Sequence, residues 1–570
     1  MVFFVCGFFV VLRSTISFII QRSLTSFTMY IKSIFISVLL LISTTIIAQD
    51  NQVSDIIKAK IEAGVDDSSI AADGIVLYSQ KMLPSYYNST NYQQSWRESK
   101  NIEELLDILK GSYNEGLTPS DYHLERINRL ISDVSSKEDP NIYADLDLIL
   151  TDAIITYARH LIIGKVSQKS IRPGWDIPQL EIPEESRGYL HTALSNKQLK
   201  KMINEIMPDH FMYMHLRNGL SAYRKIAENG GWPKVQKGQV LKLDVKDSRN
   251  VKLREYLTIT GDLPPTTVSD NDSIYDINLE DAVKKFQFRH NLNQDGIVGK
   301  GTLALINIPV EKRIEELRIN MERSRWVVHH LPQDFLVVNI AGFNIRRITN
   351  DSTVFYSRVI VGKHYHESPI FDGTLSYIEI NPTWTLPYSI ATKETLPKLK
   401  KNPNYLADKN MIIMDRDGKE LDPSTIDFNS LSRGNFPYIL RQKAGPNNAL
   451  GEVKFMFPNK YSVYLHDTPA RSLFSREERA FSHGCIRLDK KWELLMNLMG
   501  PEWDMAKINE IVTSQETTRV SLVQPIEIIL LYWTAGADKQ DLVFFNKDVY
   551  ERDPVVLKAL NKPMNSKKVK

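Results

Sequence analysis

One thiol in this chain is placed to do chemistry. The 570 residues contain two cysteines, Cys6 and Cys485, and Cys6 lies in an apolar N-terminal run that we expect to be absent from the mature protein. An exported protein with a single remaining thiol has no partner for an internal disulfide. Cys485 is therefore either one half of an intermolecular bridge or a reactive group.

The neighbours of Cys485 favour reactivity. His466 and His483 are near it in sequence, and an imidazole can activate a thiol whose ordinary pKa is about 8.5. Gly484 allows a tight bend, so that backbone N–H groups beside the thiol can converge on one point. The stretch thus contains the parts of a nucleophile, a base and an oxyanion hole.

Two other interpretations stay open from local chemistry alone. Most lone cysteines are small buried hydrophobic side chains, and Cys/His pairs can bind zinc. Zinc requires three or four ligands, and the sequence has no C-x-x-C or H-E-x-x-H pattern. Local chemistry therefore favours catalysis over burial by a small margin, and we expect no metal or other cofactor.

Several motifs in order resemble one enzyme family. Ser482-His483-Gly484-Cys485-Ile486-Arg487, with His466 upstream, is similar to the active-site signature of the YkuD-type L,D-transpeptidases. Further segments resemble the long, YcbB-like branch of that family: Asn381-Pro382-Thr383-Trp384 with Pro387, Gly445 to Gly451, Tyr464 to Pro469, and Tyr532-Trp533-Thr534 to about Asp553. A lone His-Gly-Cys would be weak, but the ordered set is specific.

The resemblance implies an acyl-transfer reaction on peptidoglycan stem peptides. The Cys485 thiolate attacks the carbonyl of the third residue of a tetrapeptide stem and expels the terminal D-Ala. The thioester then passes to the side-chain amine of a neighbouring stem, which gives a 3→3 cross-link. The family is also inhibited by carbapenems, which mimic the acyl donor.

The resemblance also suggests roles for individual residues. His466 is the expected base, and Asp467 is expected to orient its ring through either the carboxylate or the backbone carbonyl. A turn at Gly484 would draw His483 away from the thiol, to support the oxyanion or to pack as a structural histidine. Backbone N–H groups at His483, Gly484 and Cys485 are the expected oxyanion donors. The expected substrate-binding residues are Arg487, Ser482, Tyr464, Trp384 and Asn447, and a structural ion pair is the alternative for Arg487.

Three other functions remain open. Water could resolve the same acyl-enzyme, which would make the protein an L,D-carboxypeptidase, or a lipoprotein lysine could be the acceptor. A catalytically inactive wall-binding scaffold is a different class. The complete set of signature residues argues against an inactive protein.

The N-terminus predicts export. From Met29, Lys32 precedes an apolar run over residues 34–47 that ends at Ala48-Gln49, as in a secretory signal. We therefore assign residues 1–48 to targeting, with Met29 as a possible start, and expect a periplasmic monomer. An uncleaved N-terminal segment is the alternative, as the one membrane contact. A net charge of +3 without a basic stripe argues against nucleic acid as a partner.

The remaining pattern predicts a multidomain α+β chain. Apolar residues at helical spacing, such as Leu146, Leu150 and Tyr157, predict a helical scaffold domain over residues 50–235, in which Asn101 caps one helix. Residues 236–308 resemble a three-helix peptidoglycan-binding module. Residues 309–330 predict a linker helix with a solvated charged face. Residues 331–553 are rich in short β-branched runs and should form the catalytic domain, with a capping insertion at about 387–445 and a tail from 554 to 570.

Overall fold

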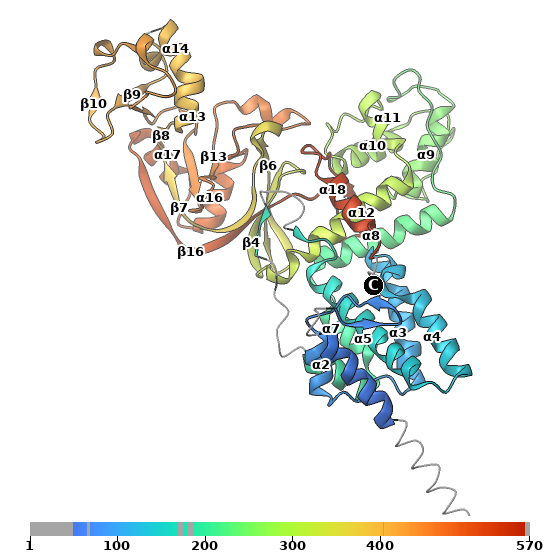
Figure 1. Cartoon of the computed structure of the whole chain (residues 1–570). Helices are drawn as coiled ribbons and strands as arrows, with labels where there is room; N and C mark the ends of the chain where they lie inside the picture. The colour runs from blue at the N-terminus through green and yellow to red at the C-terminus, as the bar shows by residue number, and fades with distance from the viewer. Residues whose placement is uncertain are drawn as a thin grey trace, which may run out of the picture.

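The computed structural model describes residues 50–64, 69–168, 175–178, 180, 187–402 and 404–564. Its helices and strands form a mixed multidomain fold, as predicted, with the elements arranged as in Figure 1. Apolar side chains are buried in three clusters: one shared by the helical domain and the β-domain, one in a small module, and one in the cap. The predicted targeting segment, residues 1–48, lies outside the described residues.

The helical domain is built around one long buried helix, α5 (Pro140–Ile163). Pro140 occupies its first turn and the Asp139 carboxylate accepts a hydrogen bond from the Asn141 N–H, so the helix start is capped. Around it lie a helix over residues 50–64, α2 (Leu83–Ser89), α3 (Ser99–Gly111), α4 (Leu124–Ser136), α6 (Arg187–Ser195), α7 (Leu199–Ile206) and α8 (Phe211–Glu228). The predicted cap at Asn101 is wrong, because α3 begins at Ser99. Asn101 is buried within α3 and its amide donates to the Leu194 carbonyl.

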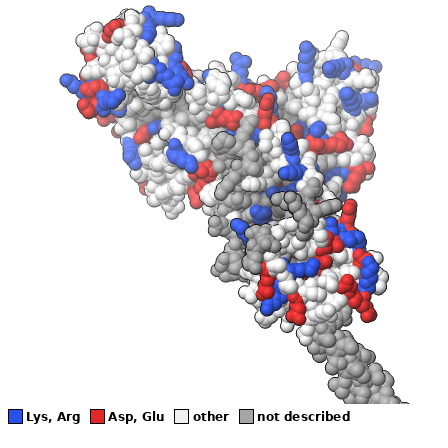
Figure 2. Space-filling view, viewed as in Figure 1, with Lys and Arg blue, Asp and Glu red and all other residues white. Residues whose placement is uncertain are grey.

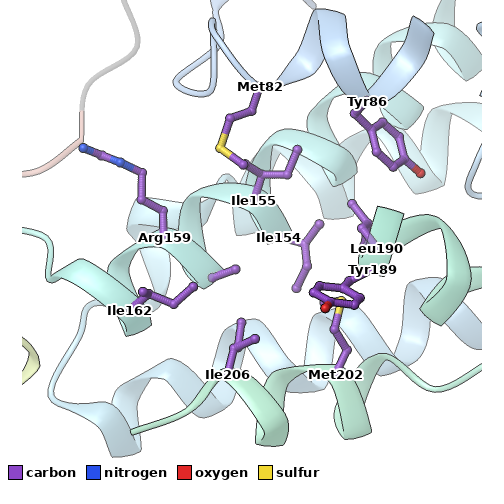
Figure 3. Close-up of a pocket in the computed structure, with 11 residues that line it drawn as sticks. Met82, Tyr86, Ile154, Ile155, Arg159, Ile162, Tyr189, Leu190, Met202 and Ile206 are labelled. Atoms are coloured by element: carbon purple, nitrogen blue, oxygen red, sulfur yellow. The ribbon is translucent and has the colours of Figure 1, made fainter. Parts of the chain in front are cut away.

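A hollow inside the helical domain lies between α2, α5, α6 and α7. Figure 3 shows Met82, Ile154, Leu190 and Met202 around it, with Arg159 at its edge. The side chains that line the hollow include no carboxylate and no imidazole. We therefore assign it no acid–base chemistry.

The helix predicted over residues 309–330 is present, but its second half does not have the predicted solvated charged face. Helix α12 (Val310–Arg325) packs between α8 and α18 (Asp553–Asn561), and its charged residues Glu322, Arg323 and Arg325 are buried. They are paired: Arg325 with Glu322 at 3.0 Å, and Arg323 with Asp553 at 2.6 Å. Pairing offsets the cost of removing these charges from water. The sequence pattern therefore predicts solvent exposure at positions where the fold has buried ion pairs. The predicted tail is also corrected, because its first part is the packed helix α18.

The small module has its own core. Helices α9 (Arg249–Ile259), α10 (Ile277–Arg289) and α11 (Lys300–Ile306) enclose the buried cluster around Phe286. Gln287 holds the following turn, because its amide donates to Asp295 at 2.7 Å and accepts from the Gly296 N–H at 2.9 Å. Gln287, Asp295 and Gly296, which resemble part of a wall-binding motif, are therefore used to form the turn after α10.

The β-domain is a closed circuit of strands. The hydrogen-bonded order is β12 (Val453–Met456), β13 (Leu465–His466), β15 (Ile486–Leu488), β6 (Ser352–Gly362), β5 (Asn344–Thr349), β4 (Asp334–Asn339), β16 (Thr518–Leu531) and β7 (Ile370–Ile380), which pairs again with β12. Because side chains alternate along a strand, one face of every strand points into the circuit. The inward side chains, such as Leu465, Ile486 and Val359, are fully buried.

Shorter elements complete this domain. Strand β14 (Ala480–Ser482) pairs with β6, and β3 (Trp175–Asp176) of the helical domain pairs with β7. Helices α16 (Lys491–Met499) and α17 (Met505–Ser514) precede β16, and a hairpin of β17 (Ala535–Ala537) and β18 (Val543–Phe545) follows it. Among the described helices, none has the length and apolar composition needed to cross a bilayer.

The insertion between β7 and β12 forms a separate cap. Its sheet consists of β8 (Trp384–Thr385), β9 (Met411–Met414), β10 (Glu420–Leu421) and β11 (Ile439–Gln442), and its helices are α13 (Tyr388–Ile390), the π-helix η7 (Ala391–Thr395), α14 (Leu396–Lys401) and α15 (Tyr405–Asp408). Lysines gather on α14, and Figure 2 shows Lys and Arg side chains over this upper-left lobe. With its own buried core, the cap is a folded unit and not a loose loop.

A buried ion pair inside the module positions the arginine that contacts the β-domain, and it offers a test. Arg289 pairs with Asp262 and donates to the Val543 carbonyl of the β-domain hairpin at 2.8 Å, with both charged side chains almost fully buried. Asp262→Asn should destabilise the module by about 3–5 kcal/mol, because the Arg289 charge stays buried without its partner. Hydrogen exchange of the α9–α11 amides measures this, with exposed Asp270→Asn as the control. Equal protection in the two variants would contradict it.

Candidate active site

Parallel pairing of β13 with β15 brings the predicted residues together. Leu465 pairs with Ile486 and His466 with Arg487, and the Ile486 N–H donates to the Tyr464 carbonyl at 3.1 Å. Because Leu465 and Ile486 point into the circuit, the alternating residues Tyr464, His466, Cys485 and Arg487 share its outer face. Residues about 20 positions apart thus become side-chain neighbours.

The same row continues onto the next strands. Lys454 of β12 lies opposite His466, and Glu379 of β7 lies opposite Lys454. The Lys454 ammonium is 3.5 Å from the Glu379 carboxylate and 4.4 Å from the centroid of the Tyr464 ring. The thiol therefore lies on a face that carries two nearby cations, Lys454 and Arg487.

The His466 ring is fixed by a backbone carbonyl. Its Nδ1 is 2.6 Å from the Asp467 oxygen, and a carbonyl only accepts, so Nδ1 carries the proton and neutral Nε2 is left to accept one. Burial, followed by the nearby Arg487 charge, lowers the pKa of His466 to about 3. The imidazole is thus neutral at physiological pH.

Asp467 orients the His466 ring through its main-chain carbonyl, which is one of the two predicted modes. Its carboxylate is used elsewhere: it pairs with Lys491 and accepts from the Glu452 N–H at 3.0 Å. Gly451, at φ 64°, lies against this carboxylate, where a Cβ would overlap its oxygens. The buried carboxylate therefore anchors the loop before β12 and the start of α16.

Cys485 is a half-buried free thiol. Its Sγ is 3.7 Å from the Ser462 carbonyl, and burial raises its pKa, although hydrogen bonds from Tyr464 act in the opposite direction. Burial thus favours the neutral form of both the thiol and the imidazole. The resting site holds a neutral pair and not a thiolate–imidazolium pair.

His483 points to the cap. Its Nε2 is 2.8 Å from the Glu394 carboxylate in the π-helix of the cap, and its ring is 5.2 Å from the His366 ring. Gly484 has φ 117° with open space where a Cβ would be, so glycine is required by the backbone turn and not by a close contact. The turn separates the His483 side chain from the outer-face row, as expected.

Two predicted roles are corrected in this loop. Ser482 is buried, and its hydroxyl donates to the Cys485 carbonyl at 2.6 Å and accepts from the Gly484 N–H at 3.1 Å. The Ser482 hydroxyl is therefore used within its own loop. The Gly484 N–H is occupied by this hydroxyl, so of the three predicted oxyanion donors the N–H groups of His483 and Cys485 remain as candidates.

The other predicted substrate residues differ in position. Arg487 forms no ion pair or hydrogen bond with the described part of the chain, and its Nε is buried without a partner. Trp384, in strand β8 of the cap, acts to lower the pKa of Tyr464, against the larger effect of burial, so this end of the cap lies near the row. Asn447 is exposed in the loop after β11, where its carbonyl accepts from Gln442. Asn447 and Trp384 are thus the two predicted residues that lie outside the row and its loop.

Sequence reasoning missed four residues at the site. Glu394 and Lys454 contact His483 and Tyr464, Lys491 holds Asp467, and the Ser368 hydroxyl donates to the Gly484 carbonyl at 2.7 Å. Ser368 and Glu394 come from segments about 90 to 120 positions upstream of Cys485. No local motif marks these residues, so they could be found only once the order of the strands and the packing of the cap were known.

The neutral resting pair predicts the pH dependence of thiol alkylation. Because burial raises the pKa of Cys485, its reaction with iodoacetamide should accelerate about tenfold per pH unit between pH 7 and 8.5, as the thiolate fraction does. The rate is measured by intact mass, with glutathione as the reference thiol. A plateau below pH 7 would show a stable thiolate–imidazolium pair instead.

The depressed pKa of His466 predicts a stability change at acid pH. The unfolded imidazole binds a proton near pH 6.5 but the folded one only near pH 3, so this contribution is present above pH 6.5 and is lost as pH falls towards 3. The slope is up to about 1.4 kcal/mol per pH unit. Urea unfolding at pH 7 and pH 4 should show a smaller loss in His466→Gln than in the wild type. The exposed His191→Gln should behave like the wild type, and equal losses in all three proteins would disprove the assignment.

Comparisons with known proteins agree with the geometry. Residues 333–517 match the family model of the L,D-transpeptidase catalytic domain, residues 81–220 match the scaffold domain, and residues 248–306 match the "Putative peptidoglycan binding domain". A protein of Haemophilus influenzae named "Putative L,D-transpeptidase" is 34% identical over 253 residues, which are 43% of this chain and 50% of that protein. The chain thus spans half the length of this curated relative.

Solved structures of L,D-transpeptidases are more distant. The enzyme from Stackebrandtia nassauensis is 11% identical with a TM-score of 0.21, over 52% of this chain and 96% of that one. The enzyme from Mycobacterium smegmatis is 14% identical with a TM-score of 0.17, over 35% of this chain and 58% of that one. These superpositions are too poor to add to the argument, which depends on the family models and the relative. Residues 333–517 thus form a YkuD-type L,D-transpeptidase catalytic domain, which follows a scaffold domain and a peptidoglycan-binding domain in the same chain.

Proposed function

We propose that the protein forms 3→3 cross-links in peptidoglycan through a Cys485 acyl-enzyme. The observation that carries this proposal is the outer-face row: a free thiol, an imidazole with an oriented and proton-free Nε2, and an unpaired guanidinium on two adjacent strands. A nucleophile, a base and a carboxylate-binding group are what acyl transfer from a stem peptide needs.

Acylation begins with Arg487 binding a carboxylate of the donor stem. Cys485 Sγ then attacks the carbonyl carbon of the third residue while its proton passes to Nε2 of His466. The N–H groups of His483 and Cys485 stabilise the oxyanion, and one such donor is worth about 2.7–4 kcal/mol. When the C–N bond breaks, the nitrogen of D-Ala takes the proton from His466 and leaves as the free amino acid.

Deacylation reverses these roles. The side-chain amine of a second stem attacks the thioester carbonyl and gives its proton to His466. The C–S bond breaks, the new amide forms the cross-link, and the proton returns to the sulfur. Cys485 is then a neutral thiol and His466 a neutral imidazole again, as at the start of the cycle.

Substrate binding would also strengthen the base. After burial, the Arg487 charge is the largest cause of the low pKa of His466. A stem carboxylate on Arg487 offsets that charge and raises the pKa of the imidazole towards the range useful for proton transfer. The free enzyme then keeps a weakly reactive neutral thiol, and the bound donor creates the stronger base.

The cap would control access of the donor to the site, and the module would keep the protein at the cell wall. The Glu394–His483 contact connects the cap to the site, and Trp384 lies near Tyr464, as in a lid that covers the donor. The module at residues 236–308 would hold the enzyme on the wall, although part of its motif is used in its own turn. A substrate of this kind lies outside the cytoplasm, so we place the protein in the periplasm.

The proposal predicts the outcome of one assay. Purified enzyme incubated with tetrapeptide muropeptides should yield 3→3 dimers and free D-Ala, read by mass spectrometry. Cys485→Ala should lower the rate about a thousandfold or more, because it removes the nucleophile. The exposed Ser132→Ala of the helical domain is the control.

Other products would point to other functions. Trimmed tripeptides without dimers would identify an L,D-carboxypeptidase, and acyl transfer only to a lysine peptide would identify a lipoprotein-attaching enzyme. Unchanged muropeptides, or dimers formed equally by Cys485→Ala, would reject the proposal.

A further inference from the structure

A polar groove runs along the junction of the module and the β-domain. Two adjoining hollows of about 360 and 410 Å³, open to solvent, share Phe288, Asn291 and Tyr356 in their walls. Figure 1 shows β6, which carries Tyr356, on the side of the β-domain that faces the module. Each hollow is as large as a typical ligand site.

The two walls are fixed to each other. The Asn291 amide donates to the Gly342 carbonyl at 3.3 Å, and Arg479 donates to the Asn291 side-chain oxygen at 2.9 Å. Arg289 connects the module to the Val543 carbonyl at 2.8 Å. The groove is thus formed by side chains of both units and exists only where they meet.

Arg346 is the unexplained residue in this groove. It lies opposite Tyr356 across β5 and β6, and its Nε is buried without a partner. It makes no ion pair or hydrogen bond to any residue in the described ranges, and burial lowers its pKa. An unpaired, partly desolvated guanidinium is costly in a folded protein unless an anion binds it.

The rest of the lining is also cationic. Arg479 is buried and donates only to neutral oxygens, and burial lowers its pKa to about 10. Six cationic side chains line the two hollows, against the carboxylates of Asp489 and Asp538. Asp489 is paired with Arg358 and Arg471, and Asp538 accepts from backbone N–H groups of its own turn. The groove therefore has positive charge to spare for an acidic ligand.

Two exposed aromatic rings complete the site. Phe288 of the module is 60% exposed and Tyr356 of the β-domain is 42% exposed. Large exposed rings beside hydrogen-bonding groups can pack on the apolar faces of sugar rings while polar groups bind the hydroxyls. Asn291 and Asn344 supply such polar groups, and the Asn344 side-chain oxygen is buried without a partner.

Strand β6 connects the groove to the thiol. Tyr356, Arg358 and Ile360 share one face of β6, and Ile360 pairs with Arg487 in the catalytic row. The antiparallel register that pairs Arg487 with Ile360 places Cys485 opposite Gly362. The four-residue step from Arg358, which lines the second hollow, to Gly362 is about 13 Å at about 3.3 Å per residue. The first three residues of an extended stem, with the lactyl group that joins them to the sugar, span a similar length of roughly 10–14 Å.

We propose that this groove binds the sugar end of the donor peptidoglycan strand. The rings of Phe288 and Tyr356 hold the saccharide, and Arg346 binds a carboxylate near the start of the stem. The stem then follows the outer face of β6 to Cys485. This inference rests on the proposed transpeptidase function but assigns a separate site, at the module junction, to the part of the substrate that does not react.

Binding to the full-length Cys485→Ala protein tests the groove. Calorimetry compares a disaccharide–tetrapeptide with the same tetrapeptide without sugars. The disaccharide–tetrapeptide should bind tighter, and Arg346→Gln should weaken it about tenfold, as expected for the loss of one charged hydrogen bond. Phe288→Ala should weaken it several-fold and should fold normally because the ring is exposed. Arg416→Gln, an exposed arginine in the cap, is the control and should bind as the parent does.

The outcomes separate this proposal from the proposed function. Equal affinity for the two ligands, or unchanged disaccharide–tetrapeptide affinity in both Arg346→Gln and Phe288→Ala, would overturn the groove. Turnover of the sugar-free tetrapeptide by the unaltered enzyme reports the transpeptidase separately, so the groove can fail while the enzyme activity stands. If the parent binds no muropeptide at all, the groove proposal is also rejected.

Discussion

The parallel pairing of β13 with β15 is the constraint on which the site depends. The strands are short, with two and three residues, so on their own they would not hold a register. The closed circuit fixes that register, because β12 pairs on the far side of β13 and β6 on the far side of β15. A slip of one residue would turn His466 and Arg487 into the apolar interior, at a large cost in buried charge.

Buried charges divide into two kinds in this protein, and the division follows their roles. In α12, Arg323 pairs with Asp553 of α18, and Arg325 pairs with Glu322 of its own helix and donates to the Glu115 carbonyl. The two residues thus hold α12 to α18 and to the helical domain. Arg346 and Arg487 have no such partner among the described residues, and both lie on the outer face of the strand circuit. A fold keeps such uncompensated cations at a cost in stability, which an anionic substrate would recover. Their placement on one face is what joins the catalytic row to the junction groove.

The electrostatics of the outer-face row also explain how the Cys485 thiol can stay unreactive in the free protein. Burial raises the pKa of Cys485 and lowers that of His466, so the resting enzyme avoids an ion pair that would react with oxidants. The cap contacts the turn beside the thiol through Glu394, which pairs with His483. Reactivity would then depend on the donor, which brings negative charge to Arg487.

The sequence by itself determined the parts that depend on local pattern. The single thiol with His466 and a Gly484 turn, the helical N-terminal half, the β-rich catalytic region and the position of the cap all follow from spacing, periodicity and motif resemblance. It failed where contacts come from distant segments. The charged face of α12 was expected to be exposed to solvent. A periodic pattern shows which face of a helix is charged, but not whether water or a carboxylate of another helix, such as Asp553, lies against it. Ser482 predicted a substrate contact, but the turn at Gly484 points its hydroxyl back to its own loop. From the sequence, Asp467 could orient His466 by its carboxylate or by its backbone carbonyl, and the structure shows that the carboxylate pairs with Lys491 instead. No sequence pattern indicated a role for Glu394, Lys454 or Arg346. Only tertiary structure decides these points, since the packing of strands and helices brings together side chains far apart in the chain, such as Arg323 and Asp553, which are 230 positions apart.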